Sequence, residues 1–509
     1  MKRLFATELI PVKTGPVSVL LLLFFFFFFS LGFLSCDDVE DFTTDRSAVL
    51  QFSRDKVEFD SVITTVPSST QTLIVYNHGS KGLRIASVHL EKGSASPFRV
   101  NVTGQDLSQT PDNYATDFEV WRRDSIIVRM EVTLPFTDSD VPHRVSDNLV
   151  FTLESGVQQR IGLTVVGRDA HFLRNATLTS DVTITGQRPT VVYGPLIVDK
   201  GVTLTLAEGT ELLFHEGAGL QVKGTLKAMG SLEKPVVLRG DRLDHMFDYL
   251  PYDRLPGRWG GVELAATSTG NDLQYVDIHG AKFGLLCLAS SLETSKLKLV
   301  NSRLHSIAGD GIAATDCQIE VINTEISNTL GHCVSLLGGD SRFVHCTLAQ
   351  FYPLDANRGN ALAIAAMENK TYHALVRADF VNCVITGYAD DVVLIPSLDK
   401  NLSADIANQQ RNYQFSNCFM ATVVPPGDVY VPRFQNIVFD NENRSAGGHE
   451  NNFALMDTHA MVYRFTPLAG SAIRGAADPA VALDYPLDRM GHSRTEDNAP
   501  DAGCYEYVQ

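Results

Sequence analysis

The chain lacks closely spaced cysteine pairs: none of its eight cysteines forms a C-x-x-C motif. Zinc and dithiol redox chemistry therefore have no support. No segment keeps an i, i+3, i+4, i+7 apolar stripe, so a helical fold is not expected. Basic residues are also few, with 42 Lys+Arg against 59 Asp+Glu and a net charge of -17. An acidic surface repels nucleic acid, and we expect no nucleic-acid partner.

The N-terminus has the pattern of a secretion signal. Basic residues precede an apolar run over residues 17–34, which contains six consecutive phenylalanines and ends at Ser35-Cys36. This order predicts a lipoprotein signal peptide over residues 1–36, cleaved ahead of a lipidated Cys36. A retained transmembrane anchor is the alternative, because the run is nearly long enough to cross a bilayer.

Two regions of β-pattern follow a short acidic tether at residues 37–46. Residues 47–169 alternate apolar and polar positions in about seven short runs with turn residues between them. This pattern predicts an immunoglobulin-like β-sandwich without the antibody disulfide, since no Cys…Trp…Cys framework is present. Short strands punctuated by glycine continue from about Leu196 and suit a coil that turns sharply several times per rung.

A repeat of 22 to 24 residues lies between about Val276 and Leu348 in the second region, residues 170–509. Val300-Asn301, Ile322-Asn323 and Val344-His345 each precede a short apolar strand, and the pattern returns later in the chain. Such a period predicts stacked β-coils, because a single coil cannot bury its own apolar face. The bend residues would form a ladder of hydrogen bonds between rungs, and Asp277 would take the same place in an earlier rung. The ladder residues are Asn301, Asn323, His345, Asn382 and Asn417.

Cysteines recur at one position of this repeat. Cys346, Cys383 and Cys418 would stack as small buried side chains, although disulfides are also open to them.

Several segments of this region carry a family resemblance. They are V-T-L-T-L-A-E-G-T at 202–210, L-Q-V-K-G-T-L at 220–226, W-G-G-V at 259–262 and P-D-A-G-C-Y-E at 500–506. The chain from about His171 resembles right-handed parallel β-helices of the pectin-lyase-like superfamily, and is similar to β-helix lipoproteins of Bacteroidetes that carry an N-terminal immunoglobulin-like module. The resemblance implies an all-β chain, with a sandwich followed by a β-helix and a C-terminal closing segment. That superfamily includes lyases, hydrolases, adhesins and scaffolds.

The resemblance also bears on location. The tether opens with D-D-V-E-D after Cys36, which is similar to acidic surface-export signals of Bacteroidetes lipoproteins. We therefore expect a lipid-anchored protein of the outer membrane, exposed at the cell surface. Enterobacterial sorting rules would instead imply the inner membrane, and acids at this position would also simply solvate a linker.

Two places could bind a ligand. The insertion at residues 241–258 is rich in acids and aromatics, although capping the side of the coil is its plainer interpretation. Arg303, Glu325 and Thr347 would align in one outward column, although an ordinary solvated Arg–Glu pair is the plainer interpretation there. The candidate ligand-binding residues are Asp241, Asp244, Asp248, Tyr249, Tyr252, Asp253, Arg254, Arg303, Glu325 and Arg342.

No catalytic constellation emerges from the motifs. Asp390-Asp391 and Gly331-His332-Cys333 only partly resemble polygalacturonase motifs, and adjacent residues on a strand point to opposite faces. A lyase would need Ca²⁺ or another neutralising group, plus a basic residue. Asp310, Asp316 and Asp340, with Arg303, Arg342 and His345, are the candidates for that chemistry.

The sequence therefore names no catalytic residues and leaves open whether the protein is an enzyme, and we expect no metal and no cofactor, with Ca²⁺ relevant only to a lyase. The first hypothesis is a non-catalytic scaffold that binds an extracellular polysaccharide or a surface protein. The second is a polysaccharide lyase or glycoside hydrolase, and the third is an inert structural or envelope-assembly component. Acidic and basic side chains that project together from three successive rungs would favour the enzyme.

Overall fold

The computed structural model describes residues 41–396, 410–423, 430–440 and 448–508. The predicted signal peptide, the lipidation site Cys36 and the first residues of the tether lie outside the described residues. No helix within the described ranges is both long and apolar enough to cross a membrane.

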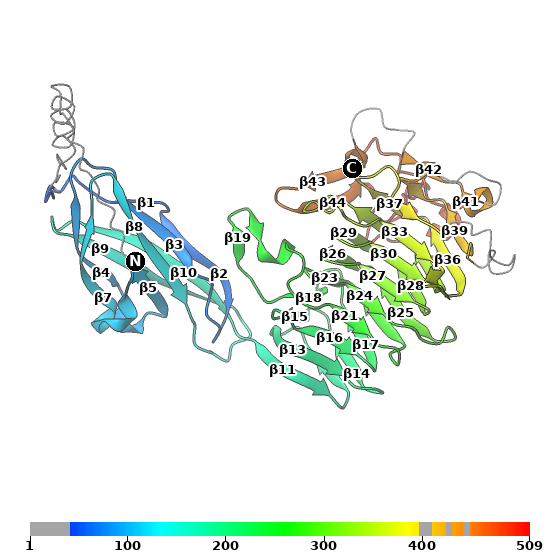
Figure 1. Cartoon of the computed structure of the whole chain (residues 1–509), viewed down its shortest axis with the longest axis horizontal. Coiled ribbons are helices and arrows are strands. Elements are labelled where there is room, and N and C mark those ends of the chain that lie inside the picture. The colour runs from blue at the N-terminus through cyan, green and yellow to red at the C-terminus, as the bar shows by residue number, and fades with distance from the viewer. Residues whose placement is uncertain (1–40, 397–409, 424–429, 441–447, 509) are drawn as a thin grey trace, which may run out of the picture. The chain divides into compact units, whose positions relative to one another are not determined.

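The N-terminal part contains two five-stranded β-sheets, which confirms the predicted β-sandwich class with ten strands where about seven were expected (Figure 1). One sheet has the order β1-β3-β8-β5-β6 and the other β2-β10-β9-β4-β7. The pairs β1–β3, β3–β8, β5–β6, β4–β7 and β4–β9 are antiparallel. Leu73, Val75, Val128 and Phe151 are fully buried in the core of this part. The strands are β1 (Gln51–Phe52), β2 (Lys56–Ile63), β3 (Gln71–Asn77), β4 (Leu83–Leu90), β5 (Phe98–Val102), β6 (Gln105–Asp106), β7 (Tyr114–Val120), β8 (Asp124–Val132), β9 (His143–Leu153) and β10 (Gln158–Arg168).

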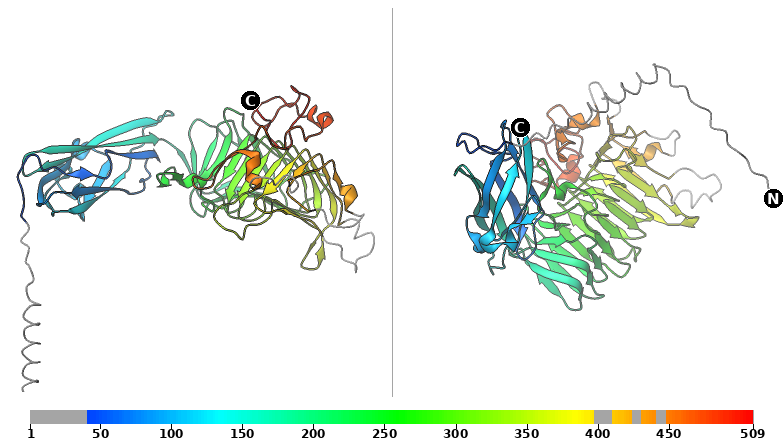
Figure 2. Two further views of the ribbon diagram at one scale, coloured as in Figure 1. Left: turned by 90° about the horizontal axis from the view of Figure 1, so that it is seen from above. Right: turned by 60° about the vertical axis from the view of Figure 1, so that its left-hand side comes forward.

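The second part is a parallel β-helix of the right-handed type, and its strands begin with β11 (His171–Leu178). Each rung contributes one strand to each of three parallel sheets, which are visible as stacked arrows in Figure 1 and from two further sides in Figure 2. β13 (Thr190–Val198) is long enough to pair with both β15 and β16, so the first and second sheets are joined into one 18-stranded sheet.

The first sheet carries the candidate site. Its strands after β13 are β15 (Glu211–Phe214), β18 (Val236–Gly240), β23 (Val276–His279), β26 (Arg303–Ile307), β29 (Glu325–Thr329), β32 (Thr347–Gln350), β37 (Val384–Gly387), β40 (Phe419–Met420) and β42 (Val438–Phe439). The second sheet contains β16 (Gly219–Val222), β21 (Val262–Leu264), β24 (Leu285–Cys287), β27 (Ile312–Thr315), β30 (Val334–Leu337), β33 (Leu362–Ala365) and β38 (Val393–Leu394). The third contains β12 (Val182–Ile184), β14 (Thr203–Leu206), β17 (Thr225–Met229), β22 (Asn271–Gln274), β25 (Ser295–Val300), β28 (Gln318–Ile322), β31 (Gly339–Val344), β36 (Leu375–Val381), β39 (Tyr413–Ser416) and β41 (Phe434–Gln435).

A left-handed residue turns the chain from the third sheet to the first sheet. Asn301, Asn323, His345, Asn382 and Asn417 have φ between 47° and 55°, as predicted for the bend. The expectation that Asp277 takes this place is wrong. Asp277 pairs with Arg303, two residues beyond the bend, and Tyr275 with φ 48° is the left-handed residue of that rung.

The predicted ladder between rungs is only partly formed. Asn382 Nδ2 lies 3.0 Å from His345 Nε2, and Asn436 Nδ2 donates to Asn417 Oδ1 at 3.2 Å. Asn323 instead donates to the Leu487 carbonyl at 2.9 Å, because the C-terminal segment lies against this bend. The ladder therefore fastens the end of the chain as well as the rungs.

The interior of the coil is filled by aligned apolar side chains. Leu304, Ile326, Leu348 and Ile385 are fully buried one above the other in the first sheet. All seven cysteines among the described residues are buried and free, so the stacked-thiol interpretation is confirmed. Trp259 of the W-G-G-V segment stacks on Phe214 with ring centroids 4.3 Å apart. A side chain at Gly261, with φ 113°, would place Cβ 2.0 Å from the Phe283 carbonyl.

The C-terminal segment closes the side of the β-helix, as the resemblance implied. The Gly503 N–H donates to the Asn382 carbonyl at 2.8 Å, and the Cys504 N–H donates to Thr347 Oγ1 at 3.1 Å. Arg494 has no exposed surface and binds Glu506 Oε1 at 2.5 Å. This segment therefore covers the first sheet around β29 and β32.

Candidate functional site

Polar side chains gather on the outer face of the first sheet. β23, β26 and β29 pair in register, so Asp277, Arg303 and Glu325 align in one column from three successive rungs. His279 and His305 align in a second column two residues further along the strands. Alternation along a strand places both columns on the same, outward face. We refer to Asp277, His279 and His305 as the Asp–His cluster.

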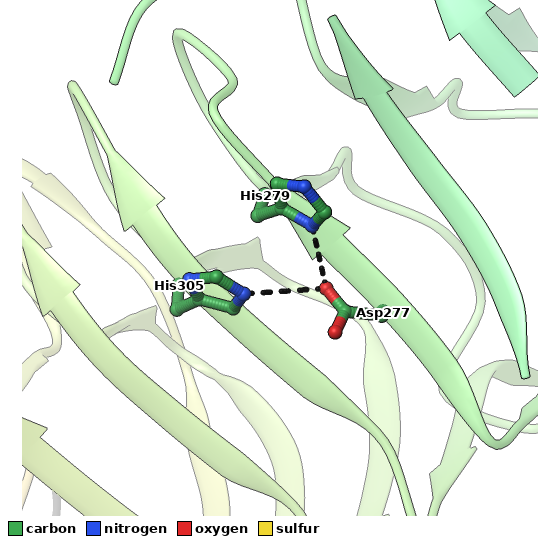
Figure 3. Close-up of side chains that lie close together, drawn as sticks. All are labelled: Asp277, His279 and His305. Atoms are coloured by element: carbon green, nitrogen blue, oxygen red, sulfur yellow. Dashed lines mark hydrogen bonds and ion pairs between the residues drawn. The ribbon is translucent and has the colours of Figure 1, made fainter. Parts of the chain in front are cut away.

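The Asp–His cluster is built around one carboxylate oxygen (Figure 3). His279 Nδ1 lies 2.7 Å and His305 Nε2 3.3 Å from Asp277 Oδ1. The two imidazoles stack with centroids 4.9 Å apart and planes 16° apart. Their side chains are only 10% and 13% exposed, and that of Asp277 is 23% exposed. The cluster is thus shielded but still reaches solvent.

Two backbone features position the histidines. Trp259 Nε1 donates to the His279 carbonyl at 2.8 Å, which ties this strand end to the buried indole. Ser306 adopts φ 55°, and its hydroxyl lies 3.1 Å from His305 Nδ1. Left-handed backbone at a serine costs free energy and persists only where surrounding structure enforces it.

The adjoining Arg303–Glu325 pair is sealed by the C-terminal segment. Arg303 Nε donates to Glu325 Oε1 at 3.0 Å, Ser327 Oγ donates to the same oxygen at 2.7 Å, and the Tyr505 hydroxyl donates to Glu325 Oε2. The Glu325 side chain is 2% exposed. The column was predicted correctly, but the expectation of a solvated ligand surface is wrong at Glu325 and Thr347, because residues 503–505 cover both.

Protonation follows from this packing. Burial opposes ionisation of Asp277, yet His279 and His305 hold its pKa well below the ordinary value. Burial and the nearby Arg303 charge lower the pKa of His305 to about 4, so this imidazole is neutral at pH 7. Burial also opposes ionisation of Glu325, but Arg303 and Arg489 lower its pKa. Burial would lower the pKa of Arg303, and Glu325 and Asp277 instead raise it.

The insertion at 241–258 divides into a braced part and an exposed part. Leu250 and Leu255 are buried in a cluster with Phe351, Phe453 and Phe465. Several of the predicted ligand residues have intramolecular partners instead: Asp241 with His215, Asp244 with Arg242, Asp253 with Arg239, Arg254 with the Ala460 carbonyl, and Tyr252 under the Arg242 guanidinium. The capping interpretation therefore holds for this part.

The exposed part carries stacked aromatic rings. Phe247 in β19 (His245–Phe247) is 51% exposed and Tyr249 is 45% exposed, with ring centroids 5.6 Å apart and planes 11° apart. His459 stacks on Tyr249 with centroids 3.9 Å apart. Asp248, which lies between Phe247 and Tyr249 in the sequence, is exposed. We refer to Phe247, Tyr249 and His459 as the ring platform.

The remaining predicted residues do not converge. Arg342 Nη1 lies 3.3 Å from Glu320 and 3.4 Å from the Tyr485 hydroxyl. Asp310, Asp316 and Asp340 bind three different partners: the His332 N–H, His373 and Arg377. Asp391 lines a pocket of about 220 Å³ with Gln350, Asn360 and Tyr388, and accepts a hydrogen bond from Thr422.

The sequence analysis missed His279 and His305. A usable signal was present, because D-x-H at 277–279 places two polar side chains on one face of a strand. His305 follows Leu304 in the next aligned strand, so the register of the repeat predicts its position beside His279. Placing Asp277 at the bend hid this relation.

Comparisons with known proteins give weak likenesses. No family model matches the chain, and no curated protein matches it. Among solved structures, a Porphyromonas gingivalis W83 protein of unknown function is 14% identical over 26% of this chain, with a TM-score of 0.17. The chain spans 60% of the length of that protein. The pectate lyase Pel9A is 12% identical, covering 67% of this chain and 88% of its own, with a TM-score of 0.31.

A Yersinia enterocolitica family 28 exopolygalacturonase is 9% identical, covering 73% of this chain and 86% of its own, with a TM-score of 0.15. The class of the protein, a β-sandwich followed by a parallel β-helix, rests on the strand pairing described above.

Proposed function

We propose that this protein binds an extracellular glycan without cleaving it, and that the ring platform is the contact surface. The observation that carries the proposal is the pair of stacked, half-exposed rings of Phe247 and Tyr249 on a braced insertion. Aromatic faces offer large contact area at little cost in side-chain entropy, and the apolar faces of sugar rings pack against them. Leu250 and Leu255 anchor the insertion, so the rings need little ordering on binding.

Polar groups for hydroxyl recognition lie in the same segment. Asp248 is exposed, and a carboxylate accepts hydrogen bonds from sugar hydroxyls. Arg242 is held by Asp244 with two contacts of 2.6 Å and stacks over Tyr252, so its guanidinium is fixed near the platform's own loop. Fixed polar groups beside an aromatic surface give orientation as well as affinity.

One geometric observation favours the alternative that the protein is an enzyme. Asp277, Arg303 and Glu325 do project from three successive rungs, which was the arrangement expected of an enzyme. Their proton affinities argue against acid–base work. A glycosidase needs one carboxyl with a raised pKa, whereas the pKa values of Asp277 and Glu325 are both lowered. Arg303 is paired with Glu325 and its pKa is raised, which disfavours it as a base.

The cellular setting belongs to the same proposal. The N-terminal pattern ending at Cys36 and the acidic residues after it support a lipid-anchored protein on the outer face of the outer membrane. At that surface an extended polysaccharide is an available ligand. A surface protein is the other partner class that this setting offers.

The experiment is a glycan-array screen on the full chain in detergent, followed by titration of the best ligand. The Phe247→Ala/Tyr249→Ala variant should lose at least about tenfold in affinity, equivalent to about 1.4 kcal/mol. Tyr114→Ala is the matched control, because Tyr114 is 46% exposed and also stacks on a histidine, His89. Equal affinities for the two variants would refute the platform.

A degradation assay with and without Ca²⁺ separates binding from catalysis. Release of unsaturated uronides by the full chain would establish a lyase and overturn the non-catalytic assignment. Binding without any product would support the proposal.

A further inference from the structure

The Asp–His cluster has the donor set of a metal site. Asp277 offers a carboxylate oxygen, His279 offers Nδ1 and His305 offers Nε2, and these ligand atoms all lie within 4.8 Å of one another. The 3.3 Å separation of His305 Nε2 from Asp277 Oδ1 matches the roughly 3.4 Å between ligands of one tetrahedral zinc ion, and the 2.7 Å separation of His279 Nδ1 from that oxygen would have to lengthen by about 0.7 Å. A small rotation of the side chains would therefore suffice to surround an ion.

The strands hold these ligands on a rigid base. Asp277 and His279 lie two residues apart on β23, and His305 is the register partner of His279 on β26. Sites on regular strands are more exact than sites on loops. The Trp259 hydrogen bond to the His279 carbonyl fixes the end of β23 further.

A second hydrogen bond orients the His305 ring, and its hydroxyl partner can serve either tautomer. Ser306 Oγ lies 3.1 Å from Nδ1 and accepts its proton when Nδ1 is the protonated nitrogen. In the other tautomer Nε2–H faces Asp277 Oδ1 and Ser306 donates to Nδ1, whereas with the proton on Nδ1 the Nε2 lone pair faces Asp277 Oδ1, another acceptor. Two facing acceptors repel unless a cation or a proton lies between them. Metal-bound histidines are oriented by such an outer hydrogen bond on the second ring nitrogen.

The neighbouring cations have carboxylates of their own. Arg303 pairs with Glu325 at 3.0 Å, and Arg239 pairs with Asp253 at 3.1 Å. Asp277 therefore has negative charge available for a bound ion. The partial exposure of the three side chains leaves a way in for that ion and for water as a further ligand.

We propose that Asp277, His279 and His305 bind one divalent transition-metal ion of the zinc class. Imidazole nitrogens suit Zn²⁺, Ni²⁺ and Co²⁺, whereas Ca²⁺ and Mg²⁺ prefer sites made of oxygen. Three protein ligands leave a fourth position for water, so the site differs from closed structural zinc sites, which have four protein ligands. This proposal is independent of glycan binding at the ring platform, which lies on a different segment.

The test uses the full chain in detergent, without a histidine tag, stripped with a chelator and then titrated with Zn²⁺. We expect one Zn²⁺ per chain by elemental analysis and visible absorption bands when Co²⁺ replaces it. His279→Ala and His305→Ala should each weaken binding at least about a hundredfold, and Ser306→Gly about tenfold. Glycine tolerates the left-handed conformation that Ser306 adopts, so only the hydroxyl is lost.

His373→Ala is the matched control. His373 Nδ1 also lies 2.7 Å from a carboxylate, that of Asp316, and its side chain is 15% exposed. This variant should bind Zn²⁺ as the unmodified chain does. Circular dichroism checks folding, and Asp277→Asn serves if either alanine variant fails to fold. Substoichiometric Zn²⁺ in the unmodified chain, or equal binding by His305→Ala and His373→Ala, would overturn the proposal.

Discussion

Removal of the Glu325 carboxylate should be among the more damaging single changes to the β-helix. The side chain is 2% exposed and accepts hydrogen bonds from Arg303, Ser327 and Tyr505. Glu325→Ala would leave the Arg303 guanidinium without its partner and three donors unsatisfied. Breaking a fully buried pair costs about 3–5 kcal/mol, and because Arg303 is 25% exposed and still lies near Asp277, the loss should fall at the lower end of that range. Urea denaturation followed by circular dichroism measures this loss.

A second Arg–Glu pair in the same β-helix provides the control. Arg342 and Glu320 lie 3.3 Å apart, but both side chains are 35% exposed. An exposed pair contributes less than about 1 kcal/mol, so Glu320→Ala should change stability little. Both variants remove a glutamate side chain from an Arg–Glu pair, and the two glutamates differ in how deeply they are buried.

The contribution of the C-terminal segment follows from a double-mutant cycle. Tyr505→Phe removes one hydrogen bond to a charged group and should cost about 1.5–3 kcal/mol. Combined with Glu325→Ala it should cost clearly less than the sum, because both changes remove the same contact. Additive losses, or a Glu325→Ala loss within about 1 kcal/mol of Glu320→Ala, would refute this reasoning.

Three further predictions concern the bend residues, the buried thiols and the loss of stability at low pH. Asn382→Ala should cost about 2–4 kcal/mol by thermal denaturation, since Asn382 has φ 55° and binds both the Asp478 N–H and His345, whereas Asn417→Ala should cost less. Burial raises the pKa values of Cys333 and Cys504 to about 12, so neither thiol should react with Ellman's reagent at pH 8 before denaturation. Burial opposes ionisation of Asp169, but its hydrogen bonds lower its pKa to about 2. The ionised carboxylate should therefore stabilise the folded protein by about 2 kcal/mol above pH 4, and this contribution is lost as the pH falls through 2. The urea midpoint of Asp169→Asn should not show this dependence on pH.

Much of the fold could be read from local pattern. The alternation of apolar and polar residues around Leu73 and Val75 predicted a strand, because one face of the strand must be buried. The repeat that contains Asn301 and Asn323 predicted stacked coils, because a single coil cannot bury its own apolar face. The register of Arg303 with Glu325 followed from the constant repeat length. The strands, their stacking and their register all follow from the spacing of apolar and bend residues, and this spacing can be read from a sequence.

The state of the candidate site could not be read in this way. Glu325 lies on the outward side of its strand, as alternation predicts, yet Tyr505 covers it from 180 residues further along the chain. Burial converts an ordinary surface pair into a sealed one, and no local pattern contains that information. The bracing of the 241–258 insertion by Phe453 and Phe465 was hidden for the same reason.

The sequence by itself determined the strands, their stacking order and the left-handed bends, because these depend on alternation, repeat length and residue conformational preference. Only the tertiary structure decided which outward residues stay exposed, since that depends on how the C-terminal segment folds back over the first sheet. It also decided that His279 and His305 meet Asp277 at one oxygen, because side-chain direction and rung register must both be fixed before three such groups converge.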